Sequence, residues 1–220
     1  MGSDLKEIII LSLQVSGQAL LISTLAGIPL GVVLGLNRFF ARRLVVALLY
    51  TGMGFPPVVV GLFVYLLLSR SGPLGSLHMD WIPALFTPGA MVAAQAIIAF
   101  PLVAGFTMAA VMGVDPMLRL QVLSLGATRR QAAWAVVKEA RVGVITSVVA
   151  GFGGIISEVG AVMLVGGNIA GKTRVLTTAI VLSTRQGDFQ LAIALGFVLL
   201  GITFIVNSLM LVLQGRAMND

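Results

Sequence analysis

Side chains that could bind a charged ligand gather in one late stretch of this chain, residues 167–188. Three cations stand there among amide and hydroxyl groups: Lys172, Arg174 and Arg185 beside Asn168, Thr173, Thr177 and Thr178. Such groups donate hydrogen bonds and supply a positive field, and they form no covalent bond with the group they hold. The chemistry available here is therefore reversible contact with a negatively charged group.

Residues for covalent or metal chemistry are sparse. The chain has no cysteine, which excludes disulfides and thiolate metal sites. Its single histidine, His78, sits in a loop-like stretch without partners for a metal site or a catalytic relay. No Ser-His-Asp set, phosphate-binding P-loop or GxGxxG fingerprint occurs. We therefore expect that this chain is not an enzyme and binds no cofactor of its own.

A single acidic residue, Glu158, falls inside the apolar segments that could enter a membrane. A carboxylate at that depth is costly unless it is paired or faces water, and it repels anions. We therefore interpret Glu158 as a gate or as half of an ion pair between spans, with Lys172 or Arg174 of either protomer as the cation. The alternative is a carboxylate that is simply solvated near the end of its span.

The composition requires a lipid environment. Of the 220 residues, 58% are hydrophobic and only 10% are charged, and the mean hydropathy is +1.06. A soluble domain carries about 25% charged residues, so this chain is expected to be an integral membrane protein. Its net charge of +6 then reports topology rather than nucleic-acid binding. Asp4 and Glu7 occupy the place of a basic n-region, which argues against a cleavable signal peptide.

Five apolar segments are long enough to cross a bilayer, which takes about 20 residues. They cover about 8–36, 44–68, 89–114, 142–166 and 189–213. In the first segment Gly27, Gly31 and Gly35 recur at every fourth residue and predict close approach of another helix. In the second, Pro56 and Pro57 predict a kink near mid-membrane, either structural only or lining a pathway.

Two stretches between these spans have helical patterns of their own. Between the third and fourth spans, Leu118, Val122 and Leu125 recur at helical spacing, Gly126 interrupts the pattern, and a second helical run follows at 131–138. Two short helices meeting at a glycine would form a knob that a soluble partner could grip; the alternative is a plain solvated loop. Later, the apolar run 175–182 is too short to span and predicts a re-entrant or interfacial helix.

The basic residues indicate the orientation of the chain. With the N-terminus outside, nine basic residues lie on the cytoplasmic side and five outside, which the positive-inside rule favours. The inner group is Arg38, Arg42, Arg43, Arg119, Arg129, Arg130, Lys138, Arg141 and Arg216, and the outer group is Lys6, Arg70, Lys172, Arg174 and Arg185. The sequence thus predicts an all-α membrane protein, a single transmembrane domain over 1–220, with its C-terminus inside. Since no tandem duplication is visible, a transport pathway would lie between two copies.

Several motifs resemble the membrane permease subunit of bacterial ABC importers, over about residues 12–188. The glycine of that family's cytoplasmic loop matches Gly126, although the family's Glu-Ala-Ala opening aligns with Leu120-Gln121-Val122 and its proline is missing. FPPVVVGL from Phe55 and GPLG from Gly72 are similar to molybdate and tungstate permeases.

A second group of motifs resembles the tungstate branch of these permeases. ISEVGAVM from Ile156 continues into VGGNI from Val165, and TR at Thr173 is followed by TTAI from Thr177. That branch commonly carries an arginine where this chain has Gly154.

The resemblance implies a type I ABC importer-like permease in the bacterial cytoplasmic (inner) membrane, surrounded by lipid. Its partners would be a second copy of itself, two cytosolic ABC ATPase subunits that use ATP and Mg, and an external solute-binding protein. The loop at about 115–141 would couple to the ATPase through Leu118, Val122, Leu125, Gly126, Ala127, Thr128 and Arg129. The substrate pathway or gate would include Pro56, Pro57, Glu158, Gly160, Asn168, Lys172, Thr173, Arg174 and Thr177.

The cargo implied by the resemblance is a tetrahedral oxyanion, most of all tungstate, with molybdate, sulfate and phosphate as alternatives. The cationic stretch 167–188 would contact that anion, or else bind lipid phosphate or the acidic surface of the binding protein. Rivals from other classes are a channel or proton-coupled carrier that uses Glu158, and a membrane anchor that recruits a cytosolic partner.

Overall fold

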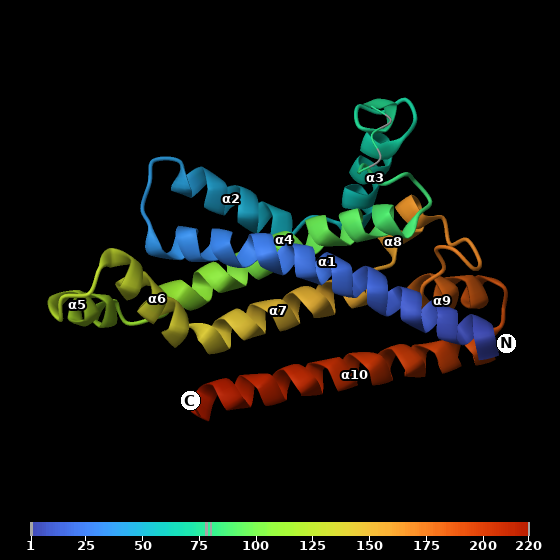
Figure 1. Cartoon of the computed structure of the whole chain (residues 1–220). Helices are drawn as coiled ribbons and strands as arrows, with labels where there is room; N and C mark the ends of the chain where they lie inside the picture. The colour runs from blue at the N-terminus through green and yellow to red at the C-terminus, as the bar shows by residue number, and fades with distance from the viewer. Residues whose placement is uncertain (1, 78, 80, 220) are drawn as a thin grey trace.

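The computed structural model describes residues 2–77, 79 and 81–219, so His78 and the prediction about its chemistry lie outside the described residues. The described chain folds into helices joined by short loops (Figure 1). They are α1 (Gly2–Leu36), α2 (Arg42–Met53), α3 (Pro57–Leu68), the short 3₁₀ helix η1 (Gly75–Leu77), α4 (Pro88–Met112), α5 (Pro116–Ser124), α6 (Arg129–Glu139), α7 (Arg141–Ile156), α8 (Gly160–Gly166), α9 (Leu176–Arg185) and α10 (Phe189–Asn219).

The centre of the molecule is a bundle of α1, α4 and α7, which pack against one another along their lengths (Figure 1). Helix α10 lies along the outside of the bundle and contacts α7 and α9, while α3 packs on α8. The N-terminus and α9 lie at one end of the bundle, and α5, α6 and the C-terminus lie at the other (Figure 1). The chain ends therefore lie on opposite sides, as an odd number of crossings requires; which side faces the cytoplasm stays a prediction.

The prediction of an all-helical membrane protein with about five spans is confirmed. Among the described residues, three apolar stretches are long enough to cross a membrane alone: Leu5–Leu36, Pro88–Met112 and Phe189–Val212. The number rises to five when two bent pairs, α2 with α3 and α6 with α7, are each counted as one span. The bends are 104° and 61°. The predicted short helix at 175–182 is α9, whose position relative to a bilayer stays a prediction.

The glycines of α1 allow its close contact with α4. A Cβ atom built on Gly27, Gly31 or Gly35 would collide with side chains or backbone of α4, including the Ala104 carbonyl and Thr107. The prediction that these residues let another helix approach is therefore confirmed. Because lipid offers no hydrophobic drive for helix association, such close packing is a main source of stability in a membrane bundle.

Two of the predicted spans are broken. At Pro56 and Pro57 the predicted kink is a complete break, because α3 starts afresh at Pro57 after an extended Pro56. The predicted span over 142–166 consists of two helices, since α7 ends at Ile156 and α8 begins at Gly160. At the start of α8, the Glu158 Oε1 accepts a hydrogen bond from the Ala161 amide at 2.9 Å, which gives a partner to one of the free amides of the first turn.

Candidate functional site

Helices α5 and α6 form the predicted knob at one end of the bundle. The side chain of Asp115 caps α5 by accepting a hydrogen bond from the Met117 amide at 2.8 Å. Gly126 then turns the chain with φ at +87°, a conformation that L-residues rarely adopt and glycine adopts freely. The sequence-based prediction of two short helices meeting at Gly126 is therefore confirmed, while the docking of an ATPase on them stays a prediction.

The start of α6 is fixed by a reciprocal pair of hydrogen bonds. The Thr128 hydroxyl accepts from the Gln131 amide at 3.3 Å, and the Gln131 side-chain oxygen accepts from the Thr128 amide at 2.8 Å. This capping box makes the second half of the knob rigid directly after the flexible Gly126. The Thr-x-x-Gln spacing was visible in the sequence and gives Thr128 a structural role that the coupling hypothesis did not include.

Large apolar side chains on the knob face outward. Leu125 is 87% exposed and Trp134 70% exposed, and Met117 and Leu120 are more than half exposed. Among the predicted coupling residues, Leu118, Val122 and Ala127 are only half-buried, and Arg129 is exposed. An apolar surface beyond the ends of the spans fits a protein partner. Sequence reasoning missed Trp134, although a tryptophan in so polar a stretch was a usable signal.

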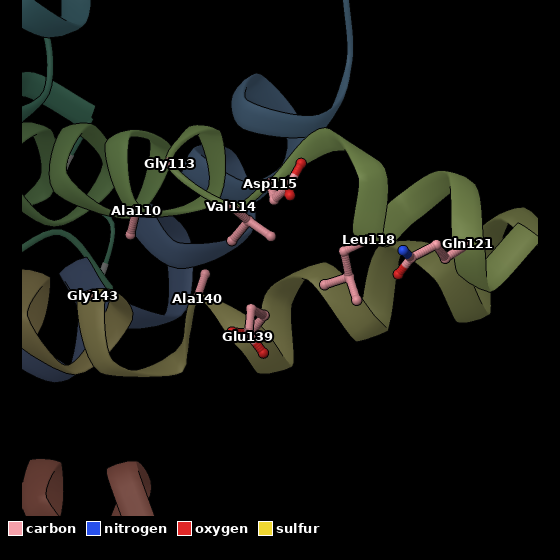
Figure 2. A pocket seen from close by; sticks show the side chains of 9 residues that line it. All are labelled: Ala110, Gly113, Val114, Asp115, Leu118, Gln121, Glu139, Ala140 and Gly143. Carbon is pink, nitrogen blue, oxygen red and sulfur yellow. The ribbon is translucent and has the colours of Figure 1, made fainter.

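The knob is joined to the bundle at its base. Val111 of α4, Val136 of α6 and Ala140, at the junction of α6 and α7, form a small buried cluster. The cluster joins the knob to the bundle. Beside this cluster lies a hollow of about 560 Å³, bounded by α5, α6 and the end of α4. Figure 2 shows Leu118 and Gln121 extending from α5 and Glu139 from α6 around it. The base of the knob is thus packed on one side and open on the other.

The two helix breaks lie against each other in the middle of the molecule. A Cβ atom at Gly61 of α3 would lie 2.5 Å from the Cα of Ala161, and one at Gly160 would lie 2.5 Å from a methyl group of Val58. The missing side chains let the first turns of α3 and α8 cross closely. The structure therefore brings together Pro57, Glu158 and Gly160, three of the predicted pathway residues; that they line a pathway stays a prediction.

Side chains of neighbouring helices bind carbonyl groups at the α7–α8 break. The Thr177 hydroxyl of α9 donates to the Glu158 carbonyl at 2.9 Å, and the Gln95 amide of α4 donates to the Ile155 carbonyl at 3.0 Å. Both side chains are buried. Irregular backbone at membrane depth needs such internal partners. Gln95 was missed in the sequence, where a glutamine in the centre of an apolar span was the available signal.

The remaining predicted residues build the loop between α8 and α9. The Thr173 hydroxyl is fully buried, donates to the Gly166 carbonyl at 2.6 Å and accepts from the Ile169 amide at 3.0 Å. The Arg174 guanidinium donates to the side chain of Asn168 at 3.2 Å and to its carbonyl at 3.4 Å. Thr173 is therefore engaged in holding the loop, whereas Arg174 is fixed by two of its five donors and retains others.

Lys172 and Arg174 line one shallow hollow of about 350 Å³ at the end of the molecule that carries the N-terminus. Glu7 of α1 lies on the same hollow, so its field is mixed. Lys172 is exposed and Arg174 half-buried. Within the described chain, the Glu158 carboxylate bonds to its own Ala161 amide and the guanidinium of Arg174 bonds to Asn168. An ion pair of Glu158 with a second protomer stays a prediction.

Sequence comparison identifies the family of this helical bundle. Residues 27–219 match the family described as binding-protein-dependent transport system inner membrane component. The chain belongs to this family. It is therefore a multi-pass inner membrane permease, and membership in such a transport system implies an ATPase and a solute-binding protein as partners.

Individual relatives of this permease match over most of its length. A probable anion ABC transporter permease protein of Haloferax volcanii is 43% identical, covering 93% of this chain and 88% of that protein. The tungstate uptake system permease protein TupB of Peptoclostridium acidaminophilum is 42% identical, covering 94% and 89%. The molybdenum transport system permease protein ModB of Escherichia coli is 32% identical, covering 79% and 77%. These names bear out the resemblance to the tungstate and molybdate permeases.

A solved structure shares the fold of this permease. The crystal structure of an amino acid ABC transporter with histidines superposes with a TM-score of 0.72, covering 98% of this chain and 94% of that chain. The two sequences are 20% identical, so this likeness concerns the fold alone.

Proposed function

We propose that this permease is the transmembrane subunit of an ATP-driven importer that carries a tetrahedral oxyanion, tungstate above all, across the inner membrane. The observation that carries the proposal is the 42% identity, over 94% of this chain, to a protein named as a tungstate uptake permease. Molybdate and sulfate are the alternative cargoes, because relatives named for their transport are 32% and 29% identical. The apolar knob supports coupling to a cytosolic motor.

The proposed transport cycle uses the packing between the knob and the bundle. Two copies of the permease enclose the pathway, and each knob sits on one of two ATPase subunits. Closure of the ATPase pair moves the knob, and the packed contact at Val136 and Val111 transmits that movement to α4 and α7. The permease binds no cofactor and performs no chemistry; ATP and Mg are used by the ATPase. The external solute-binding protein delivers the anion and largely sets its identity.

The anion meets this permease first at the hollow lined by Lys172 and Arg174. Both cations lie at the end of the bundle opposite the knob. The unused donors of Arg174 can bind the anion through hydrogen bonds, which are reversible. Glu7 at the same hollow weakens the positive field, which favours release of the ion over trapping. Glu158 keeps its structural hydrogen bond and acts at the gate rather than as an anion ligand.

Reconstitution in liposomes tests the proposed function. The permease, its ATPase and its solute-binding protein are reconstituted together, and uptake of radiolabelled tungstate is measured. We expect uptake only when ATP and both partner proteins are present, and competition by molybdate that depends on which binding protein is used. Flux of tungstate through the permease alone, driven by a concentration gradient, would show a channel or carrier and contradict the proposal.

Replacing Arg174 with glutamine tests the anion contact. We expect Arg174→Gln to slow tungstate uptake about tenfold, because a charge-assisted hydrogen bond contributes about 1.5–3 kcal/mol. The matched control is Arg185→Gln, which removes an equal charge from the exposed end of α9. Equal uptake rates and apparent affinities in the two variants would assign Arg174 to holding the loop only.

A further inference from the structure

A second hollow, about 640 Å³ in volume, lies at the knob end of the bundle. Its walls come from the end of α1 and the start of α2, from the last turn of α4, and from α5 and α6. We call it the arginine groove, because four of its lining residues are Arg38, Arg42, Arg119 and Arg129. The transport cycle proposed above gives these four arginines no common role.

The arginine groove is strongly positive. Against four guanidinium groups it contains one carboxylate, that of Asp115, which is engaged in capping α5. The groove draws its charges from three separate parts of the sequence, so a net positive field builds up where α1, α4 and α5 meet. A site of this charge attracts an anion with several acceptor oxygens.

Two of the guanidinium groups are held in place by the protein. Arg42 donates to the Leu34 carbonyl at 2.8 Å, and Arg119 donates to the Leu36 carbonyl at 3.3 Å. These carbonyls belong to the last turn of α1, which has no further helical turn to bond them. Each guanidinium has five donors, so donors remain for a ligand. The groove is therefore built before any ligand arrives.

Apolar groups border the arginine groove. The stretches Leu5–Leu36 and Pro88–Met112, long and apolar enough to span a membrane, both end at it, which places it at the boundary of the hydrocarbon. Two apolar side chains that line the groove reach its surface: Met112, at the end of α4, is 55% exposed, and Leu123 of α5 is half-buried. A free phosphate ion would gain nothing from contact with these apolar side chains. An amphipathic ligand fits such a site, because its apolar tails cover the apolar side chains while its headgroup contacts the arginines.

We propose that the arginine groove binds the phosphate headgroup of an anionic phospholipid of the adjoining leaflet. The phosphate oxygens accept hydrogen bonds from Arg38, Arg42, Arg119 and Arg129, and the acyl chains lie against Met112 and Leu123. Basic pockets between spans at the cytoplasmic side bind anionic headgroups in this way. The lipid joins the loop between α1 and α2 to the knob helices, so it stiffens the base of the knob.

Native mass spectrometry of the purified permease tests this proposal without any transport partner. Detergent solutions containing phosphatidylglycerol or phosphatidylcholine are compared, and the lipid-bound fraction is measured. We expect tighter binding of phosphatidylglycerol. The variant Arg38→Gln/Arg129→Gln should weaken phosphatidylglycerol binding about 30-fold, since each basic group near an anionic headgroup contributes about 1 kcal/mol. The two replaced side chains are exposed, so the fold is retained.

The matched control is Arg43→Gln/Arg130→Gln, which removes the same charge from the neighbouring positions in α2 and α6. Those two residues are exposed and are not among the residues lining the groove, so we expect wild-type binding. Equal loss of binding in both variants would overturn the proposal in favour of a diffuse charge effect. Displacement of the lipid by inorganic phosphate at comparable concentration would indicate a site for a soluble anion.

A second comparison separates lipid from protein as the occupant. The same two variants are tested for association with the ATPase subunit. Weakened ATPase association with unchanged phosphatidylglycerol binding in Arg38→Gln/Arg129→Gln would overturn the lipid assignment and mark the groove as a protein interface. Because lipid binding is measured on the permease alone, its outcome is independent of which oxyanion is carried and of whether import succeeds.

Discussion

Replacing Gly126 with valine is expected to uncouple the ATPase from transport. The residue has φ at +87°, where a β-branched side chain costs roughly 1–2 kcal/mol and shifts the chain toward another conformation. The turn between α5 and α6 then changes, and the exposed Leu125 next to it leaves its place on the knob. We expect ATP hydrolysis stimulated by the loaded binding protein to fall about tenfold or more, toward the basal rate, in proteoliposomes.

The control for this variant is Gly187→Val. Gly187 has φ at +79° and, like Gly126, open space around the position of a Cβ atom. It lies between α9 and α10 at the opposite end of the bundle (Figure 1), so it reports backbone strain without touching the knob. Both proteins should reach the membrane in similar amounts. Normal stimulated hydrolysis in Gly126→Val would contradict the assignment of the knob as the coupling element.

The second large effect is expected from valine at Gly31, on the contact between α1 and α4. A Cβ atom at this position would lie 2.5 Å from the Ala104 carbonyl oxygen and 2.7 Å from the Cβ of Thr107. Backbone atoms cannot swing aside as a flexible side chain can, so the two helices must separate. Overpacking of this kind costs about 3 kcal/mol or more, and we expect the thermal midpoint in detergent to fall by about 10 °C.

Gly17→Val provides the comparison within the same helix. No atom lies within 4 Å of a Cβ built on Gly17, while the helix propensity of valine is the same at both positions. Fluorescence-detected size-exclusion chromatography after heating measures both variants. A midpoint for Gly31→Val equal to that of Gly17→Val would show that α1 and α4 tolerate separation and that close packing does not hold the bundle together.

Much of the fold was predictable because lipid limits the possible structures. A stretch of about 20 apolar residues must become a helix when no water is present to bond its backbone, so the long helices α1, α4 and α10 followed from composition. Glycine at every fourth residue indicated which face of α1 is packed, and Gly126 marked the turn of the knob. Short stretches of sequence were enough to predict these helices, this packed face and this turn, because each depends on neighbouring residues in the chain.

The contacts at the α7–α8 break could not be predicted from local sequence because they are tertiary. The sequence indicates Glu158 as a gate, half of an ion pair or a solvated carboxylate, whereas in the structure its carboxylate accepts a hydrogen bond from the first turn of α8. The stabilising partners, Gln95 and Thr177, come from α4 and α9, far away in the chain. The same holds for the predicted anion ligands: Thr173 is turned inward to hold its loop, which the sequence alone could not distinguish from an open hydroxyl.

The crossing of α3 and α8 has a consequence for how this permease changes shape. Gly61 packs on Ala161 and Gly160 packs on Val58 so closely that a Cβ atom at either glycine would collide with the facing helix. We therefore expect α3 and α8 to move together when the permease changes conformation. Under the proposed coupling to an ATPase, a displacement that reaches α8 therefore moves α3 as well.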